Sequence, residues 1–336
     1  MSGWRRTASA TRFPMTPYPL IATRAFRPMS VSLLVSDTPR PRRGVPMHRE
    51  AKFVDCTTRG ACRRGAAAGP PWSILGTGGY MALRTYRVVD NDRTGPYSTL
   101  TLQGEVAASQ PGQFYMLRGD WGADPLLGRP ISILGEDAED GTVRFLVKEV
   151  GEGTRRLCSL EPGAKVFGLG PLGRPFPLPP PGAAPAALVG GGVGVPPMVY
   201  LAARLAERAL PFRFFQGART AADLLCLEDL ARAGVDPVLT TEDGSLGLRG
   251  LVTEPLRERL AECSTVYACG PEGMLKAVQA LCDGRVPSYL SLEARMGCGY
   301  GVCLGCVVPV ERNGRRAYER VCAEGPVFEG EVVRWA

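Results

Sequence analysis

Histidine is almost absent from this chain of 336 residues: the single one is His48, and residues 81–336 have none. Histidine is the side chain that most often serves as a general base near neutral pH, and it is a common metal ligand. Its absence excludes Ser-His and Cys-His catalysis, Rieske-type ligation and histidine-bound zinc from residues 81–336. Whatever chemistry this part of the chain supports must use other groups.

Long apolar runs and strong charge are also missing. No run approaches the roughly eighteen apolar residues of a membrane-spanning helix, so we expect no membrane association. The chain has 40 Lys and Arg residues and 33 Asp and Glu residues. Residues 1–80 hold 13 of the basic and 3 of the acidic residues, so residues 81–336 hold 27 basic and 30 acidic residues. The net charge of +7 therefore comes from the first eighty residues, and it does not indicate nucleic-acid binding.

Residues 1–80 lack the pattern of a folded domain. They are rich in Arg, Pro, Ala and Gly and show no sustained period of 2 or 3.6, so we predict a disordered leader. A targeting peptide is one interpretation. We favour an over-extended reading frame with the true start at Met81, because codons for Thr77-Gly78-Gly79 can spell a ribosome-binding site just before it.

Residues 81–180 read as short strands separated by Gly and Pro turns, a pattern typical of a small antiparallel barrel. The strands are rich in Val, Thr, Phe, Tyr and Leu. We expect them at Thr85–Val89, Ser98–Gln103, Gln113–Arg118, Arg129–Leu134 and Val143–Val150.

Residues 183–285 alternate strands with helices, which predicts a parallel α/β sheet with a ligand at the carboxyl ends of its strands. The first unit is a strand at Ala186–Val189, a glycine turn and a helix at Pro197–Ala209. The second is a strand at Thr265–Ala268, a turn and a helix at Glu272–Leu281. Two further strands are expected at Phe212–Phe215 and Pro237–Thr240. Turns of this kind cradle a dinucleotide phosphate. The predicted contact residues are Gly191, Gly192, Gly194, Cys269, Gly270 and Pro271.

Residues 286–336 carry the most specific motif, four cysteines spaced C-x4-C-x2-C with the fourth after a gap of fifteen residues. They are Cys298, Cys303, Cys306 and Cys322. This is the plant-type spacing of a [2Fe-2S] cluster, and it predicts an electron-transfer protein. The Asn313-Gly314 pair predicts a hairpin of Val307–Val310 with Arg316–Val321 that returns Cys322 toward Cys306.

A structural zinc site is the alternative interpretation of the four cysteines, although zinc sites usually pair two short knuckles across a longer gap. Eleven cysteines in a chain this long, many in apolar stretches, indicate a reducing compartment rather than a disulfide framework. We therefore expect a cytoplasmic protein.

A barrel, a nucleotide-binding sheet and a plant-type cluster, in this order, resemble the ferredoxin-reductase superfamily, so a multidomain ferredoxin-NADP reductase-like fold is expected. Within it, residues 81–336 resemble the electron transfer subunits of class 1B dihydroorotate dehydrogenases, whereas residues 1–80 have no counterpart. The motifs that carry the resemblance are Pro111-Gly112-Gln113-Phe114, Arg129-Pro130-Ile131-Ser132-Ile133, Gly168–Gly173, Gly190–Gly194, Tyr267–Pro271, Ser291–Met296, the cysteine loop and Val321–Phe328.

The resemblance implies FAD in the barrel. Arg129 would pair with the flavin diphosphate and Ser132 would hydrogen-bond the flavin ring. The remaining residues assigned to FAD in this way are Pro130, Ile131, Leu146, Val147, Lys148, Gly153 and Thr154, the last two as phosphate contacts.

The resemblance also implies a reaction and a partner. An FMN-containing catalytic subunit would oxidise dihydroorotate in pyrimidine biosynthesis, and electrons would cross the [2Fe-2S] cluster and FAD to NAD+. A heterotetramer with two copies of each subunit is expected, and the dihydroorotate site would lie in the partner. Cys269 would lie near the nicotinamide or be a small buried residue.

Two other functions remain open at this point. A reductase of the same architecture would serve ferredoxin or another redox partner with NADH or NADPH. A zinc-stabilised nucleotide-sensing module would keep the glycine turns and the cysteine site without a flavin, but it would leave Arg129–Ile133 without a role. Glu242 and Asp243 follow a predicted strand, and their charge would disfavour the 2′-phosphate of NADP.

Overall fold

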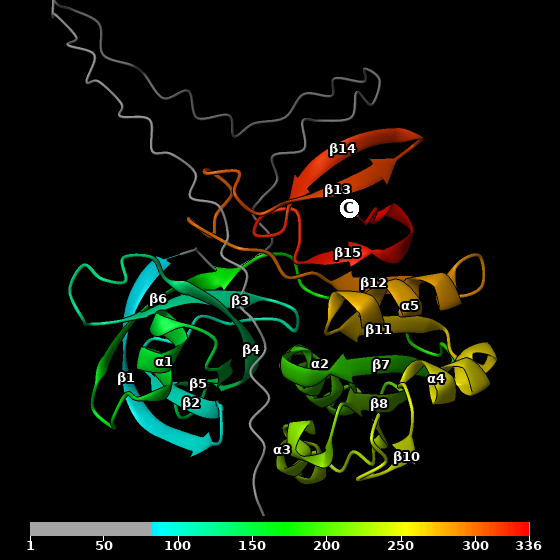
Figure 1. Ribbon diagram of the computed structural model, residues 1–336, viewed down its shortest axis with the longest axis horizontal. Coiled ribbons are helices and arrows are strands. Elements are labelled where there is room, and N and C mark those ends of the chain that lie inside the picture. Colours follow the sequence, from blue (N-terminus) through cyan, green and yellow to red (C-terminus); the bar gives the residue numbers. More distant parts are fainter. Residues whose placement is uncertain (1–81, 336) are drawn as a thin grey trace, which may run out of the picture. The chain divides into compact units, whose positions relative to one another are not determined.

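A computed structural model describes residues 82–335. The predicted leader at residues 1–80 and the proposed start at Met81 lie outside the described residues. Residues 82–335 form a barrel, an α/β domain and a C-terminal segment that holds the cysteine loop (Figure 1). Within this range no helix is both long enough and apolar enough to cross a membrane.

The predicted antiparallel barrel is confirmed, and it closes with six strands in the order β1-β2-β5-β4-β3-β6. The strands are β1 (Ala82–Thr94), β2 (Tyr97–Gln103), β3 (Phe114–Gly119), β4 (Arg129–Asp137), β5 (Thr142–Lys148) and β6 (Lys165–Leu172). The sequence did not predict β6, because Gly168 and Gly170 weaken its strand pattern. A Cβ on Gly168 would lie 2.8 Å from the ring of Tyr86, and one on Gly170 would lie 2.6 Å from the ring of Tyr115. The two glycines therefore make room for the aromatic side chains of the barrel core.

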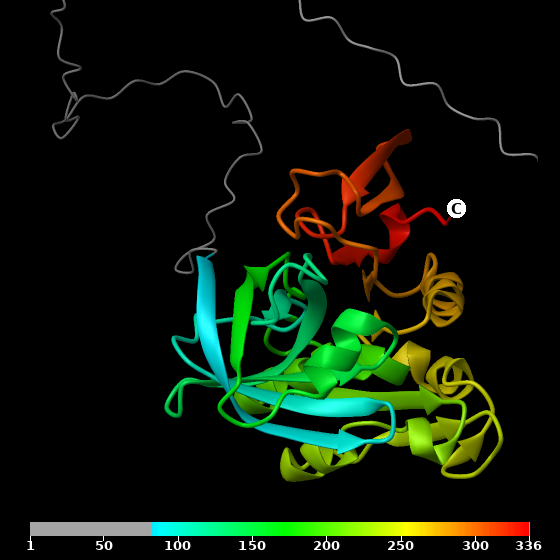
Figure 2. The same cartoon turned by 60° about the vertical axis from the view of Figure 1, so that its left-hand side comes forward.

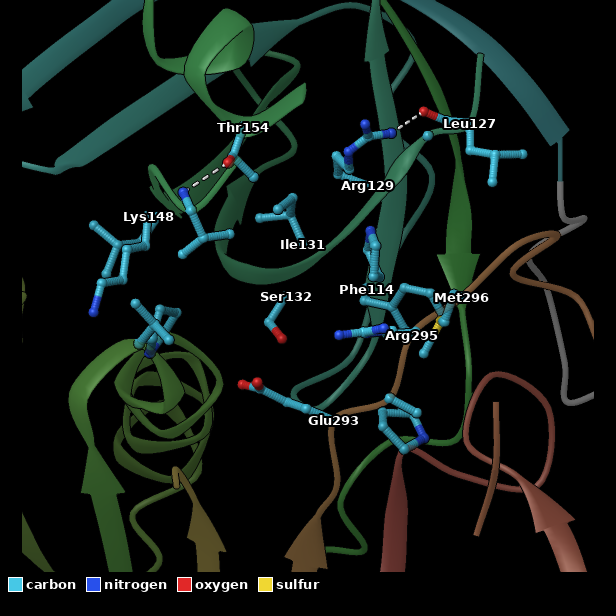
Figure 3. Close-up of a pocket in the computed structure, with 18 of the residues that line it drawn as sticks. Phe114, Leu127, Arg129, Ile131, Ser132, Lys148, Thr154, Glu293, Arg295 and Met296 are labelled. Carbon is cyan, nitrogen blue, oxygen red and sulfur yellow. Dashed lines mark hydrogen bonds between the residues drawn. The ribbon is translucent and has the colours of Figure 1, made fainter. Parts of the chain in front are cut away.

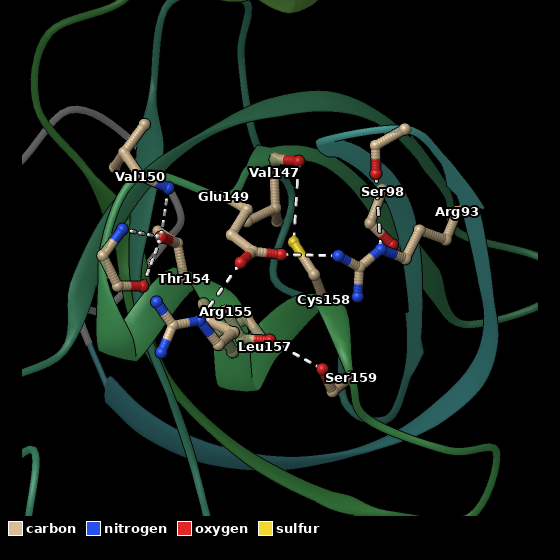
Figure 4. Close-up of polar contacts among 12 residues, drawn as sticks. Arg93, Ser98, Val147, Glu149, Val150, Thr154, Arg155, Leu157, Cys158 and Ser159 are labelled. Atoms are coloured by element: carbon tan, nitrogen blue, oxygen red, sulfur yellow. Dashed lines mark hydrogen bonds and ion pairs between the residues drawn. The ribbon is translucent and has the colours of Figure 1, made fainter.

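A short helix, α1 (Glu152–Cys158), packs Leu157 and Cys158 into the barrel core. Figure 4 shows its first turn, where the Thr154 hydroxyl accepts the N–H groups of Val150 at 2.9 Å and Gly151 at 3.1 Å. The same hydroxyl donates to the Gly151 carbonyl at 3.0 Å. Thr154 therefore fixes the turn that leads from β5 into the helix.

The predicted parallel α/β sheet is also confirmed, and it has seven strands in the order β10-β9-β8-β7-β11-β12-β15. Its strands are β7 (Ala186–Gly191), β8 (Phe212–Ala218), β9 (Val238–Thr241), β10 (Leu248–Arg249), β11 (Thr265–Cys269), β12 (Ser288–Ser291) and the antiparallel β15 (Val327–Glu329). The last two strands follow residue 285, so the C-terminal segment completes the edge of the sheet. The domain boundaries at 180, 183 and 285 stay predictions.

Helices cover both faces of this sheet, and the strands alternate accordingly. Leu188 of β7 packs in the apolar core with α2, whereas Val189 packs in the core with α4 and α5. The helices are α2 (Val195–Glu207), α3 (Leu227–Arg232), α4 (Thr253–Arg259) and α5 (Glu272–Cys282). The helix predicted at Pro197–Ala209 thus begins two residues earlier, with Pro196 and Pro197 in its first turn. Proline is tolerated there because an N–H in the first turn has no acceptor within the helix.

The predicted hairpin forms from β13 (Val307–Arg312) and β14 (Arg315–Arg320). Asn313 and Gly314 have φ values of 52° and 71°, the left-handed pair that a two-residue hairpin turn requires. Figure 2 shows the hairpin and the loop before it beside the barrel and the α/β domain. The hairpin returns the chain so that the Val321 N–H donates to the Cys306 carbonyl at 2.9 Å.

Candidate functional site

A cavity of about 770 Å³ lies where the barrel, the start of α2 and the segment after β12 meet (Figure 3). Residues predicted for FAD and for the nicotinamide line it together, although they come from strands of different domains. The predicted residues on its wall are Arg129, Pro130, Ile131, Ser132, Leu146, Lys148, Thr154 and Cys269. The structure therefore brings these residues to one cavity, while their individual roles stay predictions.

Arg129 and Gly153 are in direct contact beside this cavity. A Cβ on Gly153 would lie 2.2 Å from Nε of Arg129, so only glycine leaves room for the guanidinium over the first turn of α1. Arg129 also donates to the Leu127 carbonyl, which fixes its direction. The amides of Gly153 and Thr154 lie in the first helical turn, where an N–H has no intrahelical acceptor.

Two predicted FAD contacts differ from the rest in their geometry. The Val147 side chain is fully buried in the barrel core, because it alternates with Leu146 and Lys148 along β5. Any ligand contact of Val147 would therefore use its backbone. The Thr154 hydroxyl uses one donor and two acceptor positions within the turn. It therefore holds the turn, and any phosphate contact of Thr154 would use its backbone amide.

The predicted dinucleotide residues meet at the carboxyl ends of β7 and β11, which are neighbouring parallel strands. A Cβ on Gly194 would lie 2.4 Å from the Cys269 carbonyl carbon and from the Gly270 nitrogen. On Gly191 it would lie 2.6 Å from Met274 Sδ and 3.1 Å from Pro271 Cδ. The glycine turn is thus pressed against the Cys269-Gly270-Pro271 turn, while Gly192 has an open side and a φ of 52°.

Cys269 is a neutral thiol at the wall of the cavity. Burial raises its pKa to about 12, and the nearby Glu293 carboxylate adds to the effect. The side chain is 2% exposed. Because the thiolate is the nucleophile, Cys269 is not suited to attack a substrate at neutral pH.

The segment Ser291–Met296 forms the third wall of the cavity. It was named as a motif of the resemblance, but no contact with a cofactor was predicted for it. Glu293 projects into the open cavity, yet surrounding protein desolvates its carboxyl group and raises its pKa. The signal was the position of this segment directly before Cys298, but only the pairing of β12 with β11 shows that it reaches the cavity.

The four motif cysteines gather in the C-terminal segment as two pairs. Cys306 Sγ lies 3.2 Å from Cys322 Sγ, and the Cys322 N–H lies 3.5 Å from Cys306 Sγ. Cys298 neighbours Cys303, whose backbone and side chain both hydrogen-bond to it. Across residues 82–335 no three Cys, His, Asp or Glu side chains are arranged around a single metal ion. The described geometry is that of two cysteine pairs.

Backbone N–H groups make the loop a good host for thiolates. Burial alone would raise the pKa of Cys298, but hydrogen bonds from the backbone of Cys303, Tyr300 and Val302 outweigh it and lower the pKa to about 6. Gly299 and Gly301 have φ values of 82° and 89°, which only glycine adopts freely, and so they let the loop wrap tightly. A Cβ on Gly299 would lie 2.4 Å from Met116 Cγ, so the loop packs directly on the barrel.

Comparison with known families matches two parts of the chain. Residues 293–334 match the iron-sulfur cluster binding domain of dihydroorotate dehydrogenase B, and residues 188–280 match an oxidoreductase NAD-binding domain. The electron transfer subunit of dihydroorotate dehydrogenase B (NAD+) from Geobacillus thermodenitrificans is 43% identical over 241 residues, 70% of this chain and 91% of that protein. The corresponding Listeria monocytogenes subunit is 40% identical over 70% of this chain and 92% of its own length.

Solved structures agree with the fold. The NADH-dependent reduced ferredoxin-NADP oxidoreductase, studied for flavin-based electron bifurcation, matches with a TM-score of 0.64 and 27% identity over 74% of this chain and 90% of its own. The ferredoxin reductase of carbazole 1,9a-dioxygenase matches in fold alone, with a TM-score of 0.54 and 24% identity over 61% and 67%.

The fold and the site define an NAD-linked oxidoreductase subunit with an iron-sulfur cluster binding domain. The glycine turns, the cavity and the cysteine loop are features that such a subunit needs. The chain belongs to the family of dihydroorotate dehydrogenase B electron transfer subunits.

Proposed function

We propose that this chain binds FAD in the cavity and a [2Fe-2S] cluster between its four motif cysteines, and that it links an FMN-containing catalytic subunit to NAD+. The observation that carries the proposal is the continuity of one segment. Residues Ser291–Met296 form a wall of the cavity, and Cys298 follows after one residue. A group in the cavity and a group on the cysteines would therefore be neighbours.

The residues around the cavity fit a flavin dinucleotide. Arg129 supplies a positive charge beside the backbone amides of Gly153 and Thr154, an arrangement suited to a diphosphate. A side chain at position 153 would fill this cradle, and the native glycine leaves it open. Ile131 and Leu146 offer apolar surface to a ring system, while Ser132 offers a hydroxyl for orientation.

The cysteine loop fits an iron-sulfur cluster for a similar reason. Each of the two cysteine pairs would hold one iron, and backbone N–H groups would stabilise the negative sulfurs. When bound, the flavin exchanges a hydride with nicotinamide and the cluster transfers single electrons. The chain itself would hold the two groups close together and orient them. Thiolates must stay reduced to bind iron, which supports a reducing cytoplasmic compartment.

The glycine turn of the α/β domain supports NAD binding. The turn after β7 lies at the start of α2, where backbone N–H groups favour a pyrophosphate. Cys269 and Val193 reach from this region to the cavity wall, so a nicotinamide held there would face the flavin site. The neutral Cys269 thiol would pack against it without adding charge.

The exposed side of the cysteine loop supports contact with the catalytic subunit. Val302 and Leu304 are apolar and are 72% and 61% exposed, on either side of the exposed Cys303. Exposed apolar groups at one place mark interaction surfaces. We propose that the FMN-containing subunit covers this loop, in a heterotetramer with two copies of each chain.

Co-expression with an FMN-type dihydroorotate dehydrogenase tests the proposal. We expect one FAD and two irons per chain, and bleaching of their visible absorption by either NADH or dihydroorotate. Bleaching by NADH alone would keep the cofactors but reject the partner. A colourless protein that contains zinc would reject both the cofactors and the electron path.

The separation of the two cofactor sites is tested by Cys303→Ala. Because Cys303 does not line the cavity, we expect loss of electron transfer from dihydroorotate to NAD+ with nearly full FAD content. Cys158→Ala is the matched control, since this thiol lies buried in the barrel core. Loss of FAD from Cys303→Ala, with transfer intact in the molecules that keep it, would contradict two separate sites.

A further inference from the structure

Two polar clusters join the barrel to the α/β domain, and they are built differently. The pivot cluster consists of Ser109 and Glu136 of the barrel with Tyr200 and Arg204 of α2. The latch cluster consists of Tyr97 and Arg144 of the barrel with Asp223 and Asp229, which lie in the 3-10 helix η2 (Ala221–Asp223) and in α3.

The pivot cluster is buried and has an apolar anchor. Tyr200 packs into the hydrophobic core of the barrel, and its hydroxyl donates to the Ser109 carbonyl at 3.0 Å. Arg204 Nη2 lies 2.9 Å from Glu136 Oε1, and the Glu136 side chain is only 6% exposed. Separating the domains here would remove a tyrosine ring from an apolar core as well as break charged hydrogen bonds. This contact therefore resists opening.

The latch cluster is joined across the domains by one hydrogen bond and one ion pair. The Tyr97 hydroxyl donates to Asp223 Oδ1 at 2.9 Å, and Arg144 Nη1 lies 2.6 Å from Asp229 Oδ1. Burial and the bond to Asp223 raise the pKa of Tyr97 to about 12, so its hydroxyl keeps the proton that it donates.

Both acids of the latch keep a second partner within their own domain. Asp229 lies 3.3 Å from Arg232 Nη1, and Asp223 Oδ2 accepts from the Thr220 hydroxyl at 3.2 Å. When the domains separate here, neither carboxylate loses its last partner. Glu136 of the pivot likewise keeps the Ser109 amide and hydroxyl within the barrel. Opening the pivot is therefore costlier because the Tyr200 ring would leave the barrel core.

A polar cleft of about 610 Å³ lies at the latch and adjoins the cofactor cavity. Leu146 lines both spaces. Lys148, on the wall of the cofactor cavity, places its ammonium 5.4 Å from the ring centre of Tyr97. Tyr97 thus contacts Asp223 on one side and a cavity-lining lysine on the other, so movement at the latch reaches the cavity directly.

From these contacts we propose that Tyr97 and Arg144 are positioning residues for the NAD-dependent step. They latch the α/β domain onto the barrel, and the domain swings about the pivot cluster to admit and release the dinucleotide. The inference rests on the proposed function for the identity of the ligand, but the latch itself rests on the contacts between Tyr97 and Asp223 and between Arg144 and Asp229.

The test is the double variant Tyr97→Phe with Arg144→Met in the complete complex. Phenylalanine keeps the ring beside Lys148 and removes the hydroxyl, whereas methionine keeps the length of Arg144 and removes its charge. Because the closed state becomes less populated, we expect KM for NAD+ to rise by about three- to tenfold. At saturating NAD+ the kcat should stay close to the wild-type value, since bound ligand restores closure.

Arg232→Met is the matched control, because it removes an ion pair of the same Asp229 that lies within the α/β domain. It should leave KM unchanged. Hydrogen exchange gives a second readout: amides of β2 and α3 should exchange faster in the double variant, and NADH should restore their protection.

The latch is rejected if the double variant shows wild-type KM and exchange, or if Arg232→Met causes the same changes. A fall in kcat with unchanged KM would also reject it, since that pattern belongs to damaged chemistry. If the wild-type complex failed to pass electrons from dihydroorotate, the proposed function would fall. NADH-dependent exchange at β2 and α3 would still decide for or against the latch.

Discussion

The residue type at single positions of this site is determined by how closely neighbouring groups approach the backbone, as much as by side-chain chemistry. Gly153 and Gly151 lie two residues apart at the start of α1, in opposite surroundings: a Cβ on Gly153 meets Arg129, whereas one on Gly151 meets nothing within 4 Å. A sequence motif can show that glycines are present here. It cannot show which of them faces the arginine, because that depends on how β4 and α1 pack.

Gly153→Ala should therefore weaken FAD binding. The new methyl group displaces the guanidinium of Arg129 and removes a charge-assisted contact with the diphosphate, which corresponds to roughly ten- to a hundredfold in affinity. Titration of flavin-free protein with FAD, followed by fluorescence, measures the effect. Gly151→Ala is the control and should bind FAD nearly as the native protein does, since its φ of −173° is extended backbone. Equal affinities for the two variants would show that Arg129 does not bind the diphosphate.

Cys269 should resist thiol reagents at ordinary pH. Its pKa of about 12 arises first from burial and then from Glu293, so at pH 8 its thiolate fraction is about a thousandfold below that of an ordinary cysteine. In cluster-free protein, alkylation followed by peptide mass spectrometry should label the exposed Cys303 long before Cys269. Labelling of Cys269 should accelerate only at strongly alkaline pH. Comparable rates at pH 8 would contradict its burial.

Secondary-structure elements with a local signal were predicted well, and elements defined by packing were not. The Asn313-Gly314 pair correctly predicted the β13–β14 hairpin, because both residues favour the left-handed conformation that its turn requires. By contrast, β6 was not predicted because Gly168 and Gly170 make room for the rings of Tyr86 and Tyr115, which come from other strands. The helix α1 was missed because its seven residues are too few for a periodic pattern.

The hairpin turn offers a clean test at this scale. A Cβ on Gly314 would meet nothing within 4 Å, so any penalty for a side chain comes from its φ of 71° alone. Gly314→Val should destabilise the hairpin by about 1–2 kcal/mol, because a β-branched residue strongly avoids this region. Gly314→Asn should cost much less, since asparagine tolerates it. The rate at which a chelator bleaches the cluster absorption reports the difference, because β14 leads directly to Cys322. Equal bleaching rates for the two variants would show that the stability of the cluster does not depend on this turn.

At the scale of the whole molecule, the site is a meeting of three parts that no single sequence motif describes. The predicted FAD and nicotinamide residues lie far apart along the chain, yet Arg129 and Cys269 line one cavity. The wall at Ser291–Met296 was not predicted as a lining, because it reaches the cavity only when β12 joins the edge of the parallel sheet. The four cysteines were found from spacing alone, since the loop and the hairpin that gather them are local.

The same arrangement places the cysteine loop on the barrel and leaves its outer side exposed, which gives the last prediction. Val302→Asp and Leu304→Asp should each weaken association with the proposed FMN-containing subunit by at least about tenfold, because a buried carboxylate opposes an apolar interface. Leu248→Asp is the control: Leu248 is 54% exposed on β10, at the opposite edge of the seven-stranded sheet. Sedimentation of mixtures of the two subunits measures association, and iron and flavin contents confirm that each variant is loaded. If Leu248→Asp dissociates the complex while the loop variants do not, the catalytic subunit docks on the α/β domain. Electrons from its FMN would then have to enter this chain by a route other than the exposed face of the cysteine loop.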